Sequence, residues 1–421
     1  MEFHLRFGMQ SDKEIIHQHL QDIDGLVVPA HILAHQAAAT SVFVTSLMTI
    51  PYIVDPMTFV LQNPKDRLVS DQNNGKLRPS VKKMCHEYHP DLVVELESLT
   101  GKECLDPTKL PPIRDLCKGI VKFQQDKVKI ASQDSKAKKY LDRYTETSQE
   151  TPRAILPPYF RFESTDDDWY KTSKRCAEET AKLCGDETVA PVVCCPIGTL
   201  DDQGISTISD AYTDFTHIIL WIDNFNQYQA KEKDIGQLRK LIQRLSRNGK
   251  CQIEILYGGY LMIMMEHDGL SALSCGILYT EHKSYELVPG SKAVPERYYL
   301  PGIRAFRSLS QSDAILHRLE NLMCECPICE KVMEGKPDKF VRFADERPSA
   351  LLRKHFLAAR SKEVKSITSR TPADEVKQLR ADFERFNKTI LSLPNPDAWV
   401  SKTKMVGLDY LNEWAEAFSD D

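Results

Sequence analysis

Three cysteines within six residues, Cys324, Cys326 and Cys329 in the stretch CECPIC, form the clearest chemical motif of this chain. A tight loop with this spacing aims three thiolates at one point. That arrangement suits zinc, which usually takes four ligands in a closed structural site. His355 follows downstream, and no later cysteine or histidine exists. We therefore predict a structural Zn²⁺ bound by these four residues. A reduced thiol loop and an iron–sulfur cluster are the alternatives.

Two aspartates that follow strongly apolar runs are candidates for catalysis. Asp55 closes the run PYIVD, and Asp223 closes the run HIILWID. A carboxylate in such a place costs several kcal/mol unless it has left the core or found partners. If both runs are strands of a barrel, both side chains lie at the C-terminal edge, where barrel enzymes carry their catalytic groups. The structural alternatives are a turn residue for Asp55 and a cap or salt-bridge partner for Asp223. Glu281 is a third carboxylate of this kind.

Four residues near other strand ends are candidates for substrate binding. Gly258 and Gly259 in YGGY permit the backbone to approach a flat base closely, because a side chain would block the approach. Tyr260 offers an aromatic face for stacking, and His31 follows the apolar run GLVVPA. A tight turn, aromatic packing and a histidine satisfied within the protein are the structural alternatives.

The elements that must position these residues are apolar, β-branched runs separated by helical patterns. Strands are predicted from Gly25, Ser41 and Pro51 onward and within 190–198, 216–225, 251–260 and 270–282. Strand and helix alternating at this spacing indicate a parallel sheet. Seven strand candidates and a weaker one favour a (β/α)8 TIM-like barrel over an open sheet. The first run is also followed by no glycine-rich phosphate fingerprint.

The helical patterns suggest how the chain is divided. Residues 234–249 and 372–391 place apolar side chains on one helical face, whereas 63–185 is polar, rich in lysine and mostly helical. We expect three parts: a barrel at 1–62 and 186–310, a helical insertion at 63–185, and a zinc-binding, helical C-terminal subdomain at 311–421.

Composition sets the broad class of the protein. The chain has 421 residues, 42% of them hydrophobic, and a net charge of −5. The first residues lack the apolar core of a signal peptide, and no run approaches the about 20 apolar residues of a membrane span. We expect a cytoplasmic protein without a membrane partner, in which the twelve cysteines are mostly reduced or bound to metal.

The spacing Cys-x-Cys-x-x-Cys with a histidine 26 residues later resembles the zinc site of the tRNA-guanine transglycosylase family. The resemblance implies a (β/α)8 barrel and a structural zinc that holds a C-terminal subdomain. It also implies exchange of guanine for a 7-deazaguanine without cutting the nucleic-acid backbone. The match is complete over the zinc ligands and looser over the barrel, roughly 20–62 and 186–360. The region 63–185 looks unlike the tRNA enzymes.

Two departures from that family favour its DNA-modifying branch, which inserts 7-cyano-7-deazaguanine into DNA. The family's Asp-Ser-Gly-Gly stretch reads IVDPMTFVLQ here, so Asp55 is kept and the glycines are gone. The family's late nucleophilic aspartate corresponds to Ser274. By this resemblance Asp55 holds the place of the general base, and the loss of the late aspartate makes either Asp55 or Asp223 the nucleophile.

The sequence leaves several readings of function open. The DNA reading implies three partners: DNA, a 7-deazaguanine base and other proteins of a DNA-modification system. Lysines and arginines of 118–143, with Arg353, Lys354 and Arg360, are candidates for phosphate contacts. A solvated helix face is the alternative for that run. The other readings are a tRNA enzyme, a non-catalytic nucleic-acid-binding subunit, and an unrelated barrel hydrolase with a zinc ribbon.

Overall fold

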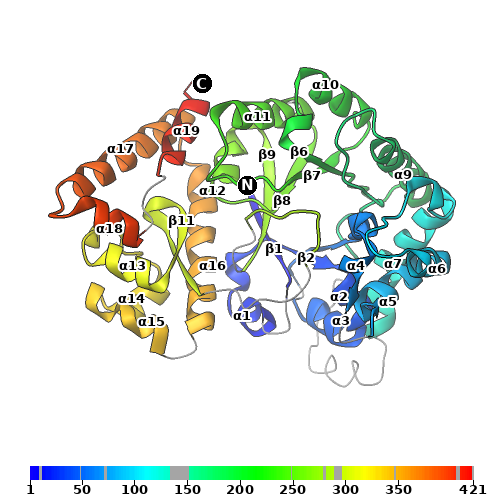
Figure 1. The fold of residues 1–421 in the computed structure, drawn as a ribbon, viewed down its shortest axis with the longest axis horizontal. Helices are drawn as coiled ribbons and strands as arrows, with labels where there is room; N and C mark the ends of the chain where they lie inside the picture. Colours follow the sequence, from blue (N-terminus) through cyan, green and yellow to red (C-terminus); the bar gives the residue numbers. More distant parts are fainter. Residues whose placement is uncertain are drawn as a thin grey trace.

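Seven parallel strands form one curled sheet in the order β3-β2-β1-β9-β8-β7-β6 (Figure 1). The computed structural model describes residues 1–8, 12–47, 49–70, 74–132, 151–247, 249–277, 281–288, 296–345, 348–403 and 408–419. The strands are β1 Glu2–Arg6, β2 Gly25–Pro29, β3 Tyr52–Asp55, β6 Val192–Pro196, β7 His217–Asp223, β8 Gln252–Leu256 and β9 Leu270–Gly276. Nearly all their side chains are buried, as expected for parallel strands covered on both faces.

An extended segment, residues 153–162, lies between β3 and β6. The backbone N–H of Arg153 donates to Tyr52 O of β3 (2.8 Å), and that of Phe162 donates to Cys194 O of β6 (3.1 Å). Ile155 also bridges to Val189. The curled sheet is therefore an α/β half-barrel of seven regular strands, and this segment occupies the interval between its two edge strands.

The predicted strands are confirmed except for one, and one strand was missed. The run from Ser41 is helix α3, Ala37–Ser46. The prediction was wrong because a short apolar run does not distinguish a buried strand from a buried helix, and Phe43 and Val44 are buried here on a helix. The first strand of the sheet is β1, whose residues Glu2–Arg6 pair with both β2 and β9.

The helices that connect these strands cover the sheet. The predicted helix at 234–249 is α11, Glu232–Ser246, whose apolar stripe is buried. The other helices that precede β9 are α1 Asp12–Gln18, α2 Ala30–His35, α4 Lys65–Leu68, α5 Pro79–Tyr88, α6 Pro90–Ser98, α7 Ile113–Ser132, α9 Asp168–Cys184, α10 Asp202–Ala211 and α12 Tyr260–Met264. Two short antiparallel strands, β4 Val69–Ser70 and β5 Lys76–Leu77, form a small hairpin.

The helices within 63–185 pack on the barrel side of the molecule. Helix α7 lies against α3, and α5 lies against α2. Buried side chains of α7, including Leu116 and Ile120, belong to the same hydrophobic core as those of the sheet. Residues 133–143 of the lysine-rich stretch 118–143 lie outside the described residues.

The C-terminal region is a hairpin and a set of helices beside the sheet. Strands β10 Arg297–Leu300 and β11 Ala305–Ser308 are antiparallel. The helices are α13 Leu309–Leu316, α14 Pro327–Met333, α15 Arg342–Asp345, α16 Pro348–Ile367, α17 Pro372–Leu391, α18 Pro396–Thr403 and α19 Tyr410–Ala417. The predicted helix at 372–391 is thus confirmed as α17. Figure 1 shows α16 running along the sheet, between it and the outer helices. Within the described residues, no helix has both the length and the apolar character needed to cross a membrane.

Candidate active site and metal centre

The C-terminal ends of the parallel strands meet at one rim, where a cavity of about 410 Å³ opens. Its volume falls in the usual range for small-molecule sites, about 300–1,000 Å³. The lining comes from the ends of β1, β2, β8 and β9 and from the loops that follow them. The lining residues are Arg6, Phe7, Gly8, Asp12, Pro29, His31, Ile32, Met57, Tyr257, Gly276, Ile277, Lys283 and Arg353.

Asp55 is the last residue of β3 and is fully buried. One carboxylate oxygen accepts from a guanidinium nitrogen of Arg6 (2.6 Å). The other accepts from the backbone N–H of Met57 (2.9 Å) and from the phenol of Tyr159 (2.8 Å). Burial raises the pKa of Tyr159 well above its ordinary value, so this phenol stays protonated as a donor. Asp55 is therefore a fixed, hydrogen-bonded carboxylate, as a buried charge requires.

Two residues near Asp55 adopt left-handed backbone conformations, which residues other than glycine rarely adopt. Met57 has φ 52° and Tyr257 has φ 61°. Such conformations cost on the order of 1 kcal/mol or more and cluster at functional sites. Here they turn both side chains into the cavity, where the Arg6 guanidinium lies over the Tyr257 ring at 5.0 Å.

Lys283 and His31 complete the polar lining. The Lys283 ammonium lies 3.4 Å from the Tyr257 hydroxyl and 5.3 Å from the centre of the Phe59 ring. Burial and the Arg6 charge lower the pKa of Lys283 to about 8, although Asp55 opposes them. Burial and the same cations lower the pKa of His31 to about 4, so the ring is neutral at pH 7. His31 thus reaches the predicted rim, where its Nδ1 contacts Met57 Sδ at 2.9 Å.

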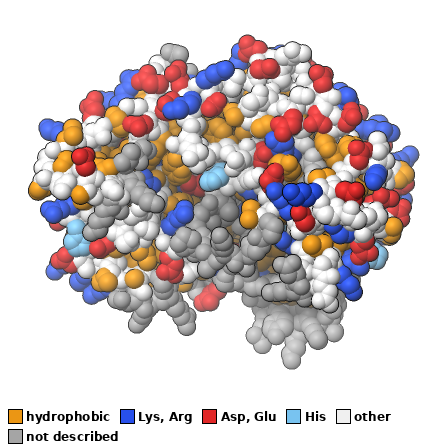
Figure 2. Space-filling model, viewed as in Figure 1, with side chains coloured by type: hydrophobic (Ala, Val, Ile, Leu, Met, Phe, Trp, Pro, Cys, Tyr) orange, Lys and Arg blue, Asp and Glu red, His pale blue; other side chains and the backbone are white. Residues whose placement is uncertain are grey.

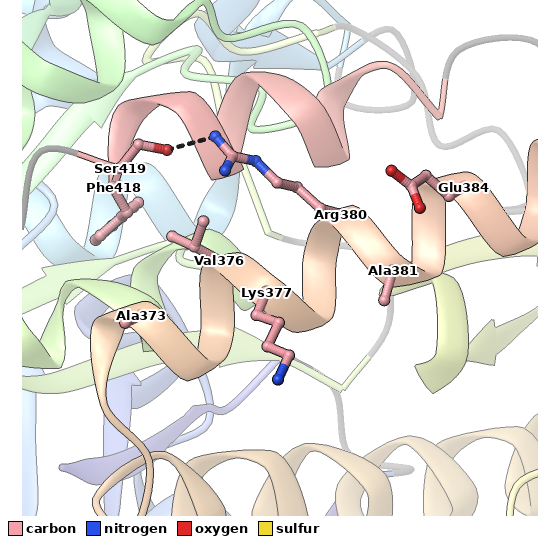
Figure 3. Close-up of a pocket in the computed structure, with 8 residues that line it drawn as sticks. All are labelled: Ala373, Val376, Lys377, Arg380, Ala381, Glu384, Phe418 and Ser419. Atoms are coloured by element: carbon pink, nitrogen blue, oxygen red, sulfur yellow. Dashed lines mark hydrogen bonds between the residues drawn. The ribbon is translucent and has the colours of Figure 1, made fainter.

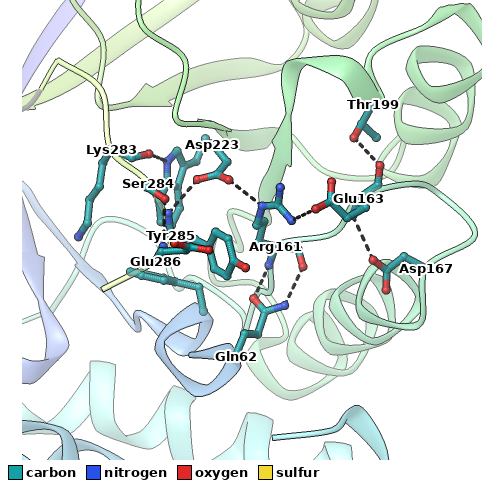
Figure 4. A network of polar contacts seen from close by, with 12 residues as sticks. Gln62, Arg161, Glu163, Asp167, Thr199, Asp223, Lys283, Ser284, Tyr285 and Glu286 are labelled. Atoms are coloured by element: carbon teal, nitrogen blue, oxygen red, sulfur yellow. Dashed lines mark hydrogen bonds and ion pairs between the residues drawn. The ribbon is translucent and has the colours of Figure 1, made fainter. Parts of the chain in front are cut away.

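Asp223, the second predicted catalytic residue, ends β7 as expected but lies in a different network (Figure 4). Its carboxylate accepts from Arg161 Nε (2.7 Å) and from the backbone N–H of Tyr285 (2.8 Å). Tyr159 and Arg161 are two residues apart in the same extended segment. That segment therefore holds both aspartates, Asp55 through Tyr159 and Asp223 through Arg161.

The YGGY residues sit where β8 passes into α12. A Cβ on Gly259 would lie 2.1 Å from the Gln227 side-chain nitrogen, and one on Gly258 would lie 3.0 Å from Met262 Cγ. Gln227 accepts from the N–H of Leu261 (2.9 Å). The space that a side chain at either glycine would need is thus occupied by Gln227 or Met262. Neither lies among the residues that line the strand-end cavity.

Tyr260 faces away from the strand-end cavity, toward the C-terminal helices. Its hydroxyl donates to Glu375 of α17 (3.0 Å), and its ring stacks with Trp414 of α19 at 6.3 Å. The Arg304 guanidinium also lies over the Tyr260 ring, 4.8 Å from its centre. Tyr260 lines a separate hollow of about 550 Å³ beside the loop that carries Cys324.

Ser274 and Glu281 lie close to the rim without lining the cavity. Ser274 is fully buried on β9, and its hydroxyl finds no hydrogen-bond partner among the described residues. Burial raises the pKa of Glu281. This carboxylate accepts from Gln227 (3.0 Å), Tyr228 (2.7 Å) and Arg360. Glu281 therefore joins the sheet to α16.

The four predicted metal ligands come together. Their ligand atoms all lie within 4.8 Å of one another, and three of the four residues are buried. His355 Nδ1 lies 3.4 Å from Cys326 Sγ and 3.2 Å from Cys329 Sγ. Ligands of a tetrahedral zinc ion, at bond lengths of about 2.0–2.3 Å, stand roughly 3.5 Å apart. The group can therefore hold a metal ion, and its ligand set suits zinc.

Residues around the four ligands orient them through hydrogen bonds, as is usual in protein metal sites. His355 Nε2 donates to the carbonyl of Tyr299 (2.7 Å), which leaves the Nδ1 lone pair facing the sulfurs. The Tyr298 ring stacks on the His355 ring at 4.2 Å, and its hydroxyl lies 3.0 Å from Cys329 Sγ. The site therefore connects helix α14 and the loop before it with helix α16 and strand β10.

A further hollow of about 490 Å³ lies between α17 and the chain end (Figure 3). Arg380 on its wall donates to the hydroxyl of Ser419 (2.8 Å) and to Glu416 (2.9 Å). None of the predicted site residues lines this hollow. In Figure 2, Lys and Arg side chains are interspersed with Asp and Glu over the described part of one face.

Of the three cations near the metal site that were predicted to contact phosphate, the two arginines pair with carboxylates of the protein. Arg360 is fully buried and pairs with Glu281 and Glu363. Arg353 is buried and pairs with Asp12 at 3.0 Å. Lys354 lies between them on α16 and is half-buried. These pairings fix α16 to the rest of the molecule.

Sequence reasoning missed three residues of this site: Arg6 and Lys283, which line the cavity, and Tyr159, which binds Asp55. Arg6 lies in a strand that the sequence analysis did not predict, although alternation in EFHLR was its signal. Tyr159 falls in PPYF, which the proline pair marks as a helix break without revealing its return to the sheet. Lys283 follows Glu281 and His282 in a polar stretch, where nothing local marks it as a cavity residue.

No family model matches the chain, and a search of curated proteins finds no match.

Proposed function

We propose that this protein is a guanine transglycosylase that exchanges guanine in DNA for a 7-deazaguanine base, 7-cyano-7-deazaguanine. The observation that carries the proposal is the assembled Cys3His group, whose ligand spacing resembles that of the transglycosylase zinc site. A cavity at the C-terminal ends of parallel strands, with a buried aspartate behind it, supports the proposal. Segment 153–162 then serves as the eighth strand of a (β/α)8 barrel.

Base exchange needs two displacements at the sugar C1′. One carboxylate attacks C1′ and the bond from C1′ to guanine breaks, while the second carboxyl group gives its proton to the leaving guanine. The incoming base then displaces the first carboxylate and returns its own proton to the second. We assign this chemistry to Asp55 and Asp223, the two strand-end aspartates. Tyr159 and Arg161 orient them from one segment. Zinc, when bound, has a structural role at Cys324, Cys326, Cys329 and His355.

A base-exchange assay tests the proposal. Protein is incubated with DNA or tRNA labelled in guanine, together with 7-cyano-7-deazaguanine, and loss of label is measured. We expect loss from DNA alone, reduced about 10²–10⁴-fold in Asp55→Asn. Asp223→Asn shows whether the second carboxylate takes part, because a full rate would assign it to structure. Loss from tRNA alone would contradict the DNA proposal.

A non-catalytic nucleic-acid-binding subunit is the second candidate. Two observations favour it: Ser274 stands where the family nucleophile is expected, and the polar atoms of Asp55 are engaged within the protein. If this second function is correct, DNA binding should survive both aspartate substitutions, and the base-exchange assay should show no loss of label. The same protein preparations serve both measurements.

A further inference from the structure

The strand-end cavity carries more positive charge than its carboxylates neutralise. Three cations line it, Arg6, Lys283 and Arg353, and one carboxylate does, Asp12. Asp12 pairs with Arg353, and Asp55, behind the wall, pairs with Arg6. One positive charge, that of Lys283, is left in excess.

Lys283 has no carboxylate partner among the described residues. Its ammonium faces the Tyr257 hydroxyl and the rings of Phe59 and Tyr257. The groups that surround it electrostatically are Arg6 from β1, His31 from α2 and Asp55 from β3. Figure 4 shows the Lys283 side chain extending away from the Asp223–Arg161 network. The ammonium is therefore available to a ligand in the cavity.

Arg6 supplies a second unused donor. Its side chain is 8% exposed, one terminal nitrogen is bound to Asp55, and the other has no partner in the described part of the chain. A buried donor without a partner costs free energy that a bound acceptor would recover. Two cations that face one cavity also repel each other: burial, followed by the Arg6 charge, lowers the pKa of Lys283.

We propose that Arg6 and Lys283 form an oxyanion-binding site in this cavity, and that its ligand is the phosphate group of a nucleotide. An oxyanion would accept from both cations through charge-assisted hydrogen bonds. The remaining lining is apolar or aromatic, with Phe7, Ile32 and Tyr257 among its residues. That lining suits the flat part of such a ligand. The oxyanion site stands independently of base exchange, whereas its assignment to a nucleotide rests on the proposed function.

Calorimetric titration with sulfate, 2′-deoxyguanosine 5′-monophosphate and deoxyguanosine tests the site. Sulfate is used because its charge does not change between pH 7 and 9. We expect sulfate and the nucleotide to bind, and the nucleotide to bind more tightly than the nucleoside. Lys283→Gln should weaken sulfate binding at least about tenfold. Lys377→Gln, in the hollow of Figure 3, is the matched control and should leave it unchanged.

Proton linkage adds an independent readout. At pH 8 about half of the Lys283 amines are neutral, and an anion that raises the pKa should draw up to about half a proton per chain from the buffer. Lys283→Arg should keep sulfate binding and lose this proton uptake, because arginine does not titrate here. If Lys283→Gln fails to fold, Lys283→Arg still tests the proposal through its proton uptake.

Each outcome decides between the proposals. Absent sulfate binding, or binding that is unchanged in Lys283→Gln, would overturn the oxyanion site. Equal affinity for nucleotide and nucleoside would overturn the assignment to a nucleotide phosphate. Sulfate binding with the expected lysine dependence, combined with no base exchange on any nucleic acid, would refute the proposed function and leave the oxyanion site established.

Discussion

At the scale of single residues, the His4 cluster shows how a buried charge is paired with opposite charges. His4 contacts Glu254 through Nδ1 (2.9 Å) and Glu2 through Nε2 (2.9 Å), and Glu254 also faces His217 at 3.7 Å. Burial opposes the charged form of His4. The carboxylate of Glu254, followed by that of Glu2, outweighs burial and raises the pKa to about 9. The imidazolium is thus the stable form inside the sheet.

We predict a pH-dependent loss of stability from His4. A pKa raised from 6.5 to about 9 on folding gives a contribution that is complete below pH 6.5. The contribution is lost as pH rises from 6.5 through 9, and it amounts to about 3 kcal/mol. Urea unfolding at pH 6, 7.5 and 9 should show this decline in the wild type and a flatter profile in His4→Gln. His86→Gln, at an exposed histidine, should keep the wild-type slope; equal slopes in all three proteins would exclude His4 as the source.

At the scale of elements, the junction between β8 and α12 depends on one small residue. Gly259 precedes α12, and the Gln227 amide occupies the place of its missing side chain. Gln227 in turn binds Leu261 and Glu281. A side chain at Gly259 must displace this amide and leave buried polar groups without partners.

We predict that Gly259→Ala lowers the free energy of unfolding by about 2–4 kcal/mol, from overpacking together with lost hydrogen bonds. The matched control is Gly236→Ala on α11, where a Cβ meets nothing within 4 Å. That change should stabilise the protein by about 0.5–1 kcal/mol, because alanine favours the helix. Denaturant midpoints of the two variants should therefore move in opposite directions, and a shift of Gly259→Ala toward higher denaturant would disprove this account.

For the whole molecule, the Cys3His group brings together the start of α14 with the loop before it and His355 of α16. It gathers a loop, α16 and the neighbourhood of β10, and α16 also pairs with the sheet through Arg360 and Glu281. Metal affinity at such a site adds directly to folding stability. The C-terminal helices should therefore depend on the metal for their order.

We predict one zinc per chain by elemental analysis, and its loss in Cys326→Ser. Metal removal by a chelator should make residues 311–421 more sensitive to protease and lower the melting temperature. Cys104→Ser replaces an exposed thiol outside the cluster and should retain the metal. Wild-type protein that is free of zinc and equally protease-resistant would contradict a structural metal.

The sequence determined the local features because each depends on neighbours along the chain. Burial of β-branched runs predicted six of the seven sheet strands, and the ends of two of them predicted where Asp55 and Asp223 lie. The spacing of three cysteines and one histidine predicted the metal group. The strand predicted from Ser41 was wrong because a short buried run suits a helix as well as a strand, and six of the ten residues of α3 are buried.

Only the tertiary structure decided which side chains face each other across the sheet. Arg6 meets Asp55 from 49 residues away because β1 and β3 flank β2. Tyr159 reaches Asp55 because segment 153–162 returns beside β3 after a long excursion. Lys283 enters the cavity from the loop after β9. Strand order sets these pairings, and the period and composition of a single segment carry no information about strand order.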